Sequence, residues 1–349
     1  MNRSVEIQSV VIKPIVSRLN IASNNSIAAA DRPYAQPKIS CVIPAYNECE
    51  NLKILLPQLA ECISAMTSKY EILIIDDGSR DDTYQTAIEF SKSFNIKAIQ
   101  FSRNFGKEAA ITAGLEHADG NLIILMDGDC QHTTAALPQF LARWREGYDM
   151  VYGVRKGREA EPIWKRYFSN FFYSLMKSAT SVPIIPDAGD FRLMDICVVN
   201  AINALPERSR FMKGLYAWVG FKSIGCTYEV QDRHAGHTSF NFKRLTQLAL
   251  TGIVSFSDIP LRVWSSVGAF LSLMSILYGL YILVRTLVNG IDVPGWSTIT
   301  VGITFLGGIQ LLSIGVLGEY IGRIFNEVKQ RPIYIVSGKS GFDTESSPK

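Results

Sequence analysis

The stretch ISCVIPAYNE, residues 39–48, decides the fold, because an almost continuously apolar run ends in a cluster of polar residues. Similar apolar runs recur after it, separated by segments long enough to form helices. Parallel strands covered on both faces have this composition, and helices usually connect them. The sequence therefore predicts an α/β fold with a mostly parallel sheet, whose further strands are EILIIDD (71–77), IKAIQFS (96–102), NLIILMD (121–127) and DMVYGV (149–154).

Polar groups lie at the carboxyl ends of the first two runs, where ligands bind in such sheets. The first run ends at Pro44, Tyr46 and Glu48, and the second ends at Asp76 and Asp77. Carboxylate oxygens there can accept hydrogen bonds from the base and ribose of a nucleoside. Asp-Gly alone is only a turn signal, but two such clusters at neighbouring strand ends favour a nucleoside site.

The fourth run leads into DGDCQH, which begins at Asp127. Two carboxylates at alternate positions beside an amide oxygen suit a hard cation, Mg²⁺ or Mn²⁺, that also binds phosphate oxygens. Such a pair is common by chance, but here it follows an apolar strand and aligns with the other strand ends. The sequence predicts a metal–diphosphate site at Asp127, Asp129 and Gln131, and His132 and His117 are interpreted as structural or surface residues.

Two segments of the middle part, about 155–262, have the apolar periodicity of amphipathic helices. They are PIWKRYFSNFFYSLMK (162–177) and FNFKRLTQLALTGIVSF (240–256). Their aromatic residues stand beside Lys and Arg, as in helices that lie in a lipid interface. Packing of either helix against a protein core stays an alternative.

Basic residues follow the fifth run and recur through the middle part. Singly, each is more often a solvated surface charge. As a group near a membrane they could hold an anionic lipid headgroup, with arginine making bidentate contacts to phosphate. The members are Arg155, Lys156, Arg158, Lys165, Arg166, Arg208, Arg210, Lys213 and Arg233.

An acidic cluster, DAGDFRLMD (187–195), follows Pro186. The proline and the mixed polar composition indicate a loop. Asp187 and Asp190 could orient an acceptor, or a carboxylate of this stretch could cap the helix that follows.

The third part of the chain is predicted to be a membrane anchor of two helices. Residues 263–284 and 293–318 contain no charged residue, and about 20 apolar residues span a bilayer. Cations flanking the pair outnumber Arg285 in the connecting loop, which places the catalytic part and both termini in the cytoplasm. The flanking cations are Arg262, Arg323, Lys329 and Arg331.

Composition excludes several classes of protein. A formal net charge of +3 gives no electrostatic case for binding nucleic acid. The six cysteines are scattered without a CxxC pair, which indicates reduced thiols in a cytosolic compartment. Residues 1–37 lack the apolar core and cleavage site of a signal peptide and are predicted to be a flexible extension. Contact of Val10–Leu19 with a membrane stays an alternative.

Five motifs together resemble the family 2 glycosyltransferases of GT-A fold, and among them the polyprenyl-phosphate glycosyltransferases, which include dolichol-phosphate mannose synthase and bactoprenol glucosyltransferases. The likeness covers about 38–335. One departure follows Arg233, where the family often reads AGESKY and this chain reads AGHTSF, so that the usual lysine is missing and His237 stands nearby. The motifs are VIPAYNE, IIDDGSRDDT, FSRNFGKEAAITAGL, MDGDCQH and DAGDFRLMD.

The resemblance implies a role for most of the predicted site residues. Arg233 would join the residues that bind the lipid phosphate, but the departure after it puts contacts from that stretch in doubt. The roles implied are nucleoside binding for Pro44, Glu48, Asp76 and Asp77, metal–diphosphate binding for Asp127, Asp129 and Gln131, and lipid-phosphate binding for Arg155, Arg166 and Ser169.

We therefore expect inverting transfer of a hexose from a nucleotide-diphosphate sugar to undecaprenyl phosphate. UDP-glucose is the first candidate donor, ahead of a UDP-amino sugar or GDP-mannose. Because a phosphate acceptor is already a nucleophile at neutral pH, Asp187 and Asp190 would orient groups rather than abstract a proton. A processive polysaccharide synthase would need more spans and a QxxRW motif, and the sequence shows neither. A nucleotide-sensing membrane scaffold without turnover stays an alternative.

The expected division of the chain follows from these segments. The sequence Gly-Glu-Tyr-Ile-Gly at 318–322 could pack spans together in a homo-oligomer. The parts are a flexible extension (1–37), a GT-A catalytic domain (38–239), an interface-helix region (240–262), two transmembrane helices (263–318) and a cytoplasmic tail (319–349).

Overall fold

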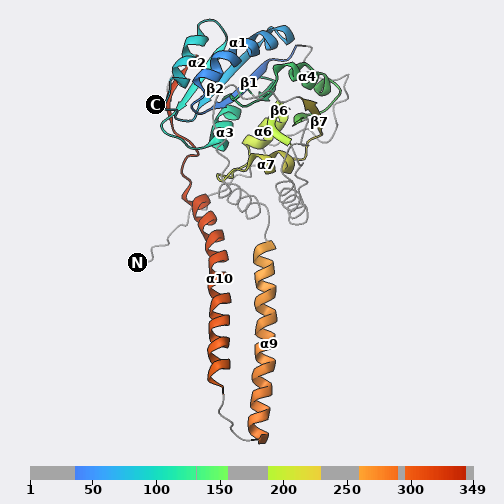
Figure 1. The fold of residues 1–349 in the computed structure, drawn as a ribbon. Helices are drawn as coiled ribbons and strands as arrows, with labels where there is room; N and C mark the ends of the chain where they lie inside the picture. The colour runs from blue at the N-terminus through green and yellow to red at the C-terminus, as the bar shows by residue number, and fades with distance from the viewer. Residues whose placement is uncertain (1–35, 131, 156–187, 229–258, 290–294, 343–349) are drawn as a thin grey trace, which may run out of the picture.

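The computed structural model describes residues 36–130, 132–155, 188–228, 259–289 and 295–342. An α/β part stands at one end of two long helices (Figure 1). Its elements, in chain order, are β1 (Ile39–Ala45), α1 (Cys49–Met66), β2 (Tyr70–Asp76), α2 (Thr83–Ser91), β3 (Ile96–Phe101), α3 (Lys107–His117), β4 (Leu122–Leu125), the 3₁₀ turn η3 (Thr134–Ala136), α4 (Leu137–Arg145), β5 (Met150–Arg155), β6 (Ala188–Asp195), α6 (Ile196–Asn203), α7 (Met212–Trp218), β7 (Ser223–Tyr228) and β8 (Val336–Ser340). The long helices are α9 (Ile259–Asn289) and α10 (Trp296–Lys329).

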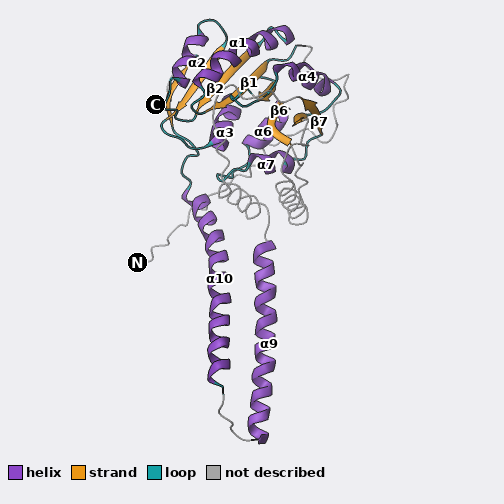
Figure 2. Ribbon diagram, in the orientation of Figure 1, coloured by secondary structure: helices purple, strands orange, loops and turns teal. Residues whose placement is uncertain are grey.

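The described strands form one sheet of order β7-β5-β6-β4-β1-β2-β3-β8 (Figure 2). Strands β4, β1, β2 and β3 are parallel to their neighbours in that run, and β5 is parallel to β7. Strands β6 and β8 run antiparallel to the strands they pair with. The predicted α/β class with a mostly parallel sheet is confirmed, and each predicted apolar run forms a strand.

Helices cover both faces of the sheet. Apolar residues of α1, α2 and α4 pack on one face, and those of α3, α6 and α7 pack on the other. Strand β1 supplies both cores, because Cys41 and Ile43 face one side and Val42 faces the other. Burial on both faces explains why these strands read as continuous apolar runs instead of alternating ones.

Residues 188–195 form strand β6, so the predicted loop at this stretch is wrong. Phe191 lies in the core on one face, and Arg192 is buried although it is charged. The buried polar residues mask the alternation by which a strand is recognised in a sequence. The expected cap is confirmed, since the side chain of Asp195 accepts a hydrogen bond from the amide of Cys197 at the start of α6.

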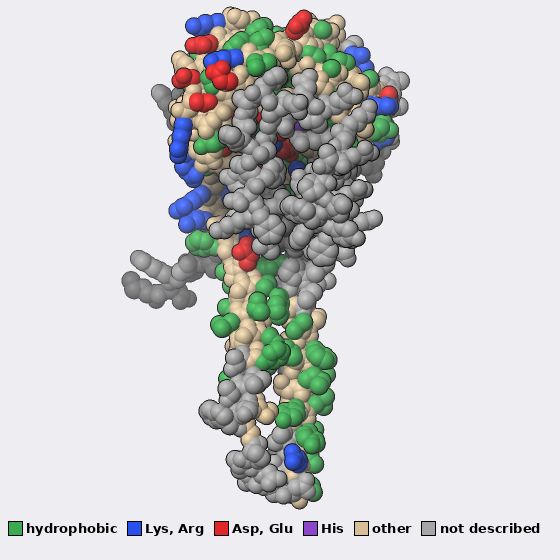
Figure 3. Space-filling model, viewed as in Figure 1, with side chains coloured by type: hydrophobic (Ala, Val, Ile, Leu, Met, Phe, Trp, Pro, Cys, Tyr) green, Lys and Arg blue, Asp and Glu red, His purple; other side chains and the backbone are tan. Residues whose placement is uncertain are grey.

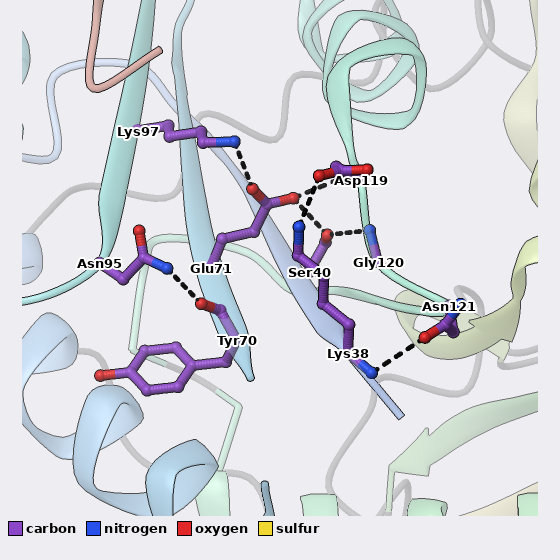
Figure 4. Close-up of polar contacts among 9 residues, drawn as sticks. All are labelled: Lys38, Ser40, Tyr70, Glu71, Asn95, Lys97, Asp119, Gly120 and Asn121. Carbon is purple, nitrogen blue, oxygen red and sulfur yellow. Dashed lines mark hydrogen bonds and ion pairs between the residues drawn. The ribbon is translucent and has the colours of Figure 1, made fainter. Parts of the chain in front are cut away.

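A buried carboxylate joins the amino ends of the central strands (Figure 4). Glu71 of β2 pairs with Lys97 Nζ at 2.7 Å, and it accepts hydrogen bonds from the hydroxyl of Ser40 and, at 2.9 Å, from the amide of Asp119. Burial raises the pKa of Glu71, but these donors outweigh it and leave the pKa below its usual value. The network ties β1, β2, β3 and the α3–β4 loop together at the end of the sheet opposite the predicted site.

Helices α9 and α10 run side by side away from the α/β part and expose apolar side chains along their length (Figures 1 and 3). Among the described residues, one segment, Phe305–Lys329, is long and apolar enough to cross a membrane. A shorter apolar stretch, Ser266–Tyr281, lies in α9. The second span of the predicted anchor stays a prediction.

The chain after α10 returns to the sheet as β8, antiparallel to β3. The ring of Tyr334 stacks on that of Phe101, and its hydroxyl donates a hydrogen bond to Glu116 at 2.6 Å. The predicted tail, 319–349, therefore includes the end of α10 and an edge strand of the α/β part. The predicted amphipathic helices, and the extension up to residue 35, lie outside the described residues.

Candidate functional site

The loops that follow β1 and β2 are joined by hydrogen bonds. The amide of Asn47 donates to Ser79 Oγ at 2.9 Å, and the amide of Arg80 donates to Asn47 Oδ1 at 2.8 Å. The amide of Glu48 donates to Thr83 Oγ1 at 2.9 Å. Asn47 has a φ of 56°, a left-handed conformation that asparagine tolerates better than most residues. The two strand-end loops therefore form a single platform, as expected for neighbouring parallel strands.

The structure brings the predicted nucleoside residues to this platform. Pro44 is buried at the end of β1, whereas Tyr46 is 40% exposed beside it. Asp76 is buried and accepts hydrogen bonds from the amide of Ser79 at 3.0 Å and from the side chain of Gln100 at 3.1 Å. The orientation of the Asp76 carboxylate is thus set by the loop after β2 and by strand β3.

Asp77 makes its hydrogen bonds to the loop that precedes α3. Its carboxylate accepts from the amide of Phe105 at 2.6 Å and from that of Gly106 at 2.9 Å. Burial raises the pKa of Asp77, and the two amides only partly offset that rise. These bonds set the position of Lys107, the first residue of α3.

Strand β6 brings a second carboxylate opposite the predicted metal site. It runs antiparallel to β4, with Leu125 opposite Arg192. Continuation of this register beyond the paired residues places Asp127 opposite Asp190. Lys107 Nζ lies between them, 2.6 Å from Asp127 Oδ1 and 2.7 Å from Asp190 Oδ2. The structure therefore unites three segments that are far apart in the sequence.

The three charges of this cluster stabilise one another. Burial opposes the ionised form of each group, but the two carboxylates outweigh it and hold the pKa of Lys107 above its usual value. Lys107 in turn holds the pKa values of Asp127 and Asp190 below theirs, despite burial. Sequence reasoning missed Lys107. A signal was present, because a lysine at the first position of a helix is opposed by the helix dipole and needs acidic partners.

His132, interpreted from the sequence as a structural or surface residue, belongs to the same cluster. It is buried, with Nε2 3.4 Å from Asp127 Oδ2 and Nδ1 3.0 Å from the hydroxyl of Tyr228. Its ring stacks on that of Phe191 in β6. His132 therefore holds Asp127 from the side of the protein interior.

Among the described residues, Asp127, Asp129 and His132 could hold a metal ion, with one ligand atom from each lying within 4.8 Å of the others. Two carboxylates and an imidazole are donors that divalent cations accept, and the carboxylates suit Mg²⁺ and Mn²⁺. The loop also lies near the platform, since a Cβ atom at Gly128 would be 3.7 Å from Glu48 Cγ. The donor set fits a cation that also binds a nucleotide diphosphate.

The remaining predicted site residues lie at the end of β5 or outside the described part of the chain. The backbone of Arg155 ends β5, where it pairs with Tyr228 of β7. The residues that lie outside the described part of the chain are Gln131, Arg166, Ser169, Asp187 and Arg233.

Comparison with known proteins identifies the family. Residues 40–200 match the family model described as glycosyl transferase family 2, and residues 259–324 match that of the GtrB C-terminal hairpin. The SfII prophage-derived bactoprenol glucosyl transferase of Shigella flexneri is 43% identical over 86% of this chain and 97% of its own. The chain belongs to glycosyltransferase family 2. These matches confirm the resemblance to this family that the sequence motifs of the glycosyltransferase predicted.

Other relatives of the glycosyltransferase are similar over most of their length. An uncharacterized glycosyltransferase of Synechocystis is 44% identical over 88% of this chain and 96% of its own. The putative glycosyltransferase CsbB of Bacillus subtilis is 42% identical over 86% and 92%. Among solved structures, the mannosyltransferase of Pyrobaculum calidifontis in complex with GDP-Man and Mn²⁺ is 15% identical over 86% and 89%, with a TM-score of 0.47.

Proposed function

We propose that the protein transfers glucose from UDP-glucose to a polyprenyl phosphate, with inversion at the anomeric carbon. The observation that carries this proposal is the cluster of Asp127, Asp129, Asp190 and Lys107 beside the strand-end platform. Several relatives with more than 40% identity are named bactoprenol glucosyl transferases, which supports this donor sugar and lipid acceptor.

The platform binds the nucleoside in this proposal. Asp76 and Glu48 accept hydrogen bonds from the ribose and base, and Pro44 and Tyr46 form the adjoining wall. Asp77 acts indirectly, because its carboxylate is hydrogen-bonded to the loop that carries Lys107.

Asp127 and Asp129, with Gln131, would hold a divalent cation, Mg²⁺ or Mn²⁺. When bound, the cation would supply positive charge to stabilise the diphosphate leaving group. Lys107 adds a fixed positive charge at the same edge, in a region partly closed to water, where electrostatic stabilisation of a leaving group is strongest. His132 keeps Asp127 oriented.

The acceptor phosphate attacks the anomeric carbon directly. A phosphate monoester carries roughly −1.5 to −2 charges at pH 7 and needs no general base. Asp190 and Asp187 then orient groups. Arg155, Arg166, Ser169 and Arg233 hold the lipid phosphate, and the positive charges of the three arginines compensate its negative charge. Direct attack predicts a β-linked product from an α-linked donor and no covalent sugar–enzyme intermediate.

The hairpin of α9 and α10 inserts into the membrane with the α/β part on the cytoplasmic side. The helices have 31 and 34 residues, or about 46 and 51 Å at 1.5 Å per residue, against a hydrocarbon thickness of about 30 Å. Large apolar side chains are more than half exposed along both helices, for example Phe270 at 63% and Leu311 at 72%. A lipid environment would cover this surface, which is too extensive for a soluble monomer.

The test measures transfer of radiolabelled glucose from UDP-glucose to undecaprenyl phosphate by the full chain in membranes, with GDP-mannose and UDP-N-acetylglucosamine as competing donors. Asp129→Asn should lose at least about 100-fold in rate, since even partners that only orient a metal ligand are worth 10 to 100-fold. Asp119→Asn is the matched control, because this carboxylate pairs with Lys38 at the opposite end of the sheet. Wild-type activity of Asp129→Asn with added Mg²⁺ or Mn²⁺ would remove Asp129 from the site.

Stereochemistry provides a second test. NMR of the lipid-linked product should show the anomeric centre inverted relative to the donor. Retention of configuration, or a glycosyl-enzyme trapped by rapid quenching, would overturn the proposed direct attack.

A further inference from the structure

A cavity of about 340 Å³ lies where the end of α10 meets the α/β part. Its walls come from the start of α3, the loop between α6 and α7, the end of α10 and the residues that follow it. Lys107, the residue before Glu108 in the cavity wall, belongs to the site described above. The cavity therefore adjoins the candidate site and extends from it toward the end of α10.

The lining of the cavity is strongly basic. Arg208 and Arg210 come from the α6–α7 loop, and Lys329 and Arg331 come from the end of α10 and beyond. Among the described residues of the lining, Glu108 is the one acidic side chain, and burial raises its pKa to about 7, so that it carries only part of a negative charge at neutral pH. Four cations around one partly neutral acid favour an anionic ligand.

Two arginines of this lining are held in place by backbone carbonyls. Arg210 donates from Nε to the carbonyl of Glu207 at 3.1 Å and from Nη2 to that of Leu205 at 3.0 Å. Its Nη1 is buried and has no hydrogen-bond partner among the described residues. Arg208 donates from Nη1 to the carbonyl of Arg331 at 2.6 Å, across two walls of the cavity. Fixed guanidinium groups in the wall of a cavity are suited to bind phosphate oxygens.

A carboxylate beside the lining, Glu327, is already engaged. Glu327 of α10 accepts hydrogen bonds from the amides of Arg208 at 3.1 Å and Ser209 at 2.9 Å. This contact holds the α6–α7 loop against the end of α10. It therefore builds the cavity and does not compete with a ligand for the guanidinium groups.

The cavity opens next to apolar surface on α10. Ile324 and Val328, in the turns before Lys329, are 61% and 72% exposed. Figure 3 shows basic side chains gathered on the flank where the α/β part meets the helices, next to the apolar side chains below. A lipid whose acyl chains lie along α10 would place its headgroup beside Lys329 and Arg331.

We propose that this cavity binds the phosphate headgroup of an anionic phospholipid and so fixes the α/β part against the membrane surface. This inference rests on the membrane insertion of α9 and α10 given under the proposed function. The ligand is a structural lipid of the bilayer and not the acceptor, whose phosphate is assigned to Arg155, Arg166, Ser169 and Arg233.

The experiment titrates the purified full chain, in a neutral detergent, with dioctanoyl phosphatidylglycerol, dioctanoyl phosphatidylcholine or inorganic phosphate, and counts bound lipid by native mass spectrometry. We expect phosphatidylglycerol to bind at least about tenfold more tightly than phosphatidylcholine. The double variant Arg210→Gln/Lys329→Gln should lose at least about tenfold in affinity for phosphatidylglycerol. The single variant Lys329→Gln changes only an exposed side chain and should show part of that loss if the double variant does not fold.

Lys339→Gln is the matched control, because it removes one exposed cation from the same C-terminal segment outside the cavity. It should bind phosphatidylglycerol as the wild type does. Equal binding of the two lipids, or unchanged affinity in Lys329→Gln, would overturn the proposal. Inorganic phosphate binding as tightly as phosphatidylglycerol would make this a site for free phosphate and would equally overturn it. No nucleotide sugar is present, so failure of the proposed glucosyl transfer leaves this result interpretable.

Discussion

At the scale of single residues, Lys107 connects the two acidic strands of the site. Its ammonium contacts Asp127 and Asp190 at hydrogen-bond distance, and among the described residues no other lysine or arginine is paired with either carboxylate. The same group both prevents repulsion between the carboxylates and supplies positive charge at the expected position of the diphosphate. Its loss should therefore affect binding of the nucleotide and the chemical step together.

We predict that Lys107→Met lowers kcat/KM for UDP-glucose by roughly 100-fold. Because Lys107 lowers the pKa values of Asp127 and Asp190, its removal should raise both and move the acid limb of the pH–rate profile to higher pH. Lys92→Met, at the exposed end of α2, is the control and should leave rate and profile unchanged. An unshifted acid limb in Lys107→Met would show that this ion pair does not govern the carboxylates.

At the scale of elements, the two ends of the sheet have different roles. The carboxyl ends of β1, β2 and β4 bear the site, and the amino ends are tied by the buried Glu71 network (Figure 4). Because that network includes residues of β1, β2, β3 and the α3–β4 loop, it stabilises the arrangement of strands on which the site depends without contacting it.

We predict that Glu71→Gln destabilises the protein by about 3 kcal/mol, the cost of breaking a buried ion pair from one side. The pKa of Glu71 is lower in the folded state than its unfolded value of about 4.3. The carboxylate therefore contributes its full stabilisation above pH 4.3 and loses it as the pH falls through the folded pKa. Thermal unfolding of the full chain from pH 3 to 7 should show a steeper acid loss in the wild type than in Glu71→Gln. Glu50→Gln is the control, because Glu50 forms an exposed ion pair with Lys53 on α1. Parallel curves of stability against pH for the wild type and Glu71→Gln would contradict the role of Glu71.

At the scale of the whole molecule, the end of α10 is joined to the α/β part twice. Glu327 accepts hydrogen bonds from backbone amides of the α6–α7 loop, and β8 pairs with β3. These contacts fix the position of the α/β part, and with it the candidate site, relative to the end of α10.

We predict that both termini are cytoplasmic and that the α9–α10 connection is outside. A cysteine introduced between Asn289 and Trp296, in a variant without its native cysteines, should react with a membrane-impermeant maleimide in intact cells. A cysteine at Lys349 should react only after the cells are permeabilised. Protection of the connection, together with labelling of position 349 in intact cells, would contradict the two-span topology and the cytoplasmic site.

The sequence by itself determined the features that depend on residues close together in the chain, namely the strands, the long helices and the polar residues at the strand ends. The continuous apolar runs predicted the strands from β1 to β5, and the polar residues after them predicted Asp76, Asp127 and Asp129 at one edge, since parallel strands end together. The uncharged stretches likewise predicted α9 and α10. Each of these patterns is local, and the physics that produces it acts within one element.

Only the tertiary structure decided which distant segments meet. Strand β6 pairs with β4, which sets Asp190 opposite Asp127, and the turn held by Asp77 brings Lys107 between them. The return of β8 and the basic cavity below it likewise join segments from opposite ends of the catalytic part. Such contacts depend on strand order and on the burial of charged groups that compensate one another. Neither the order of the strands nor the pairing of distant buried charges leaves a periodic pattern in the sequence.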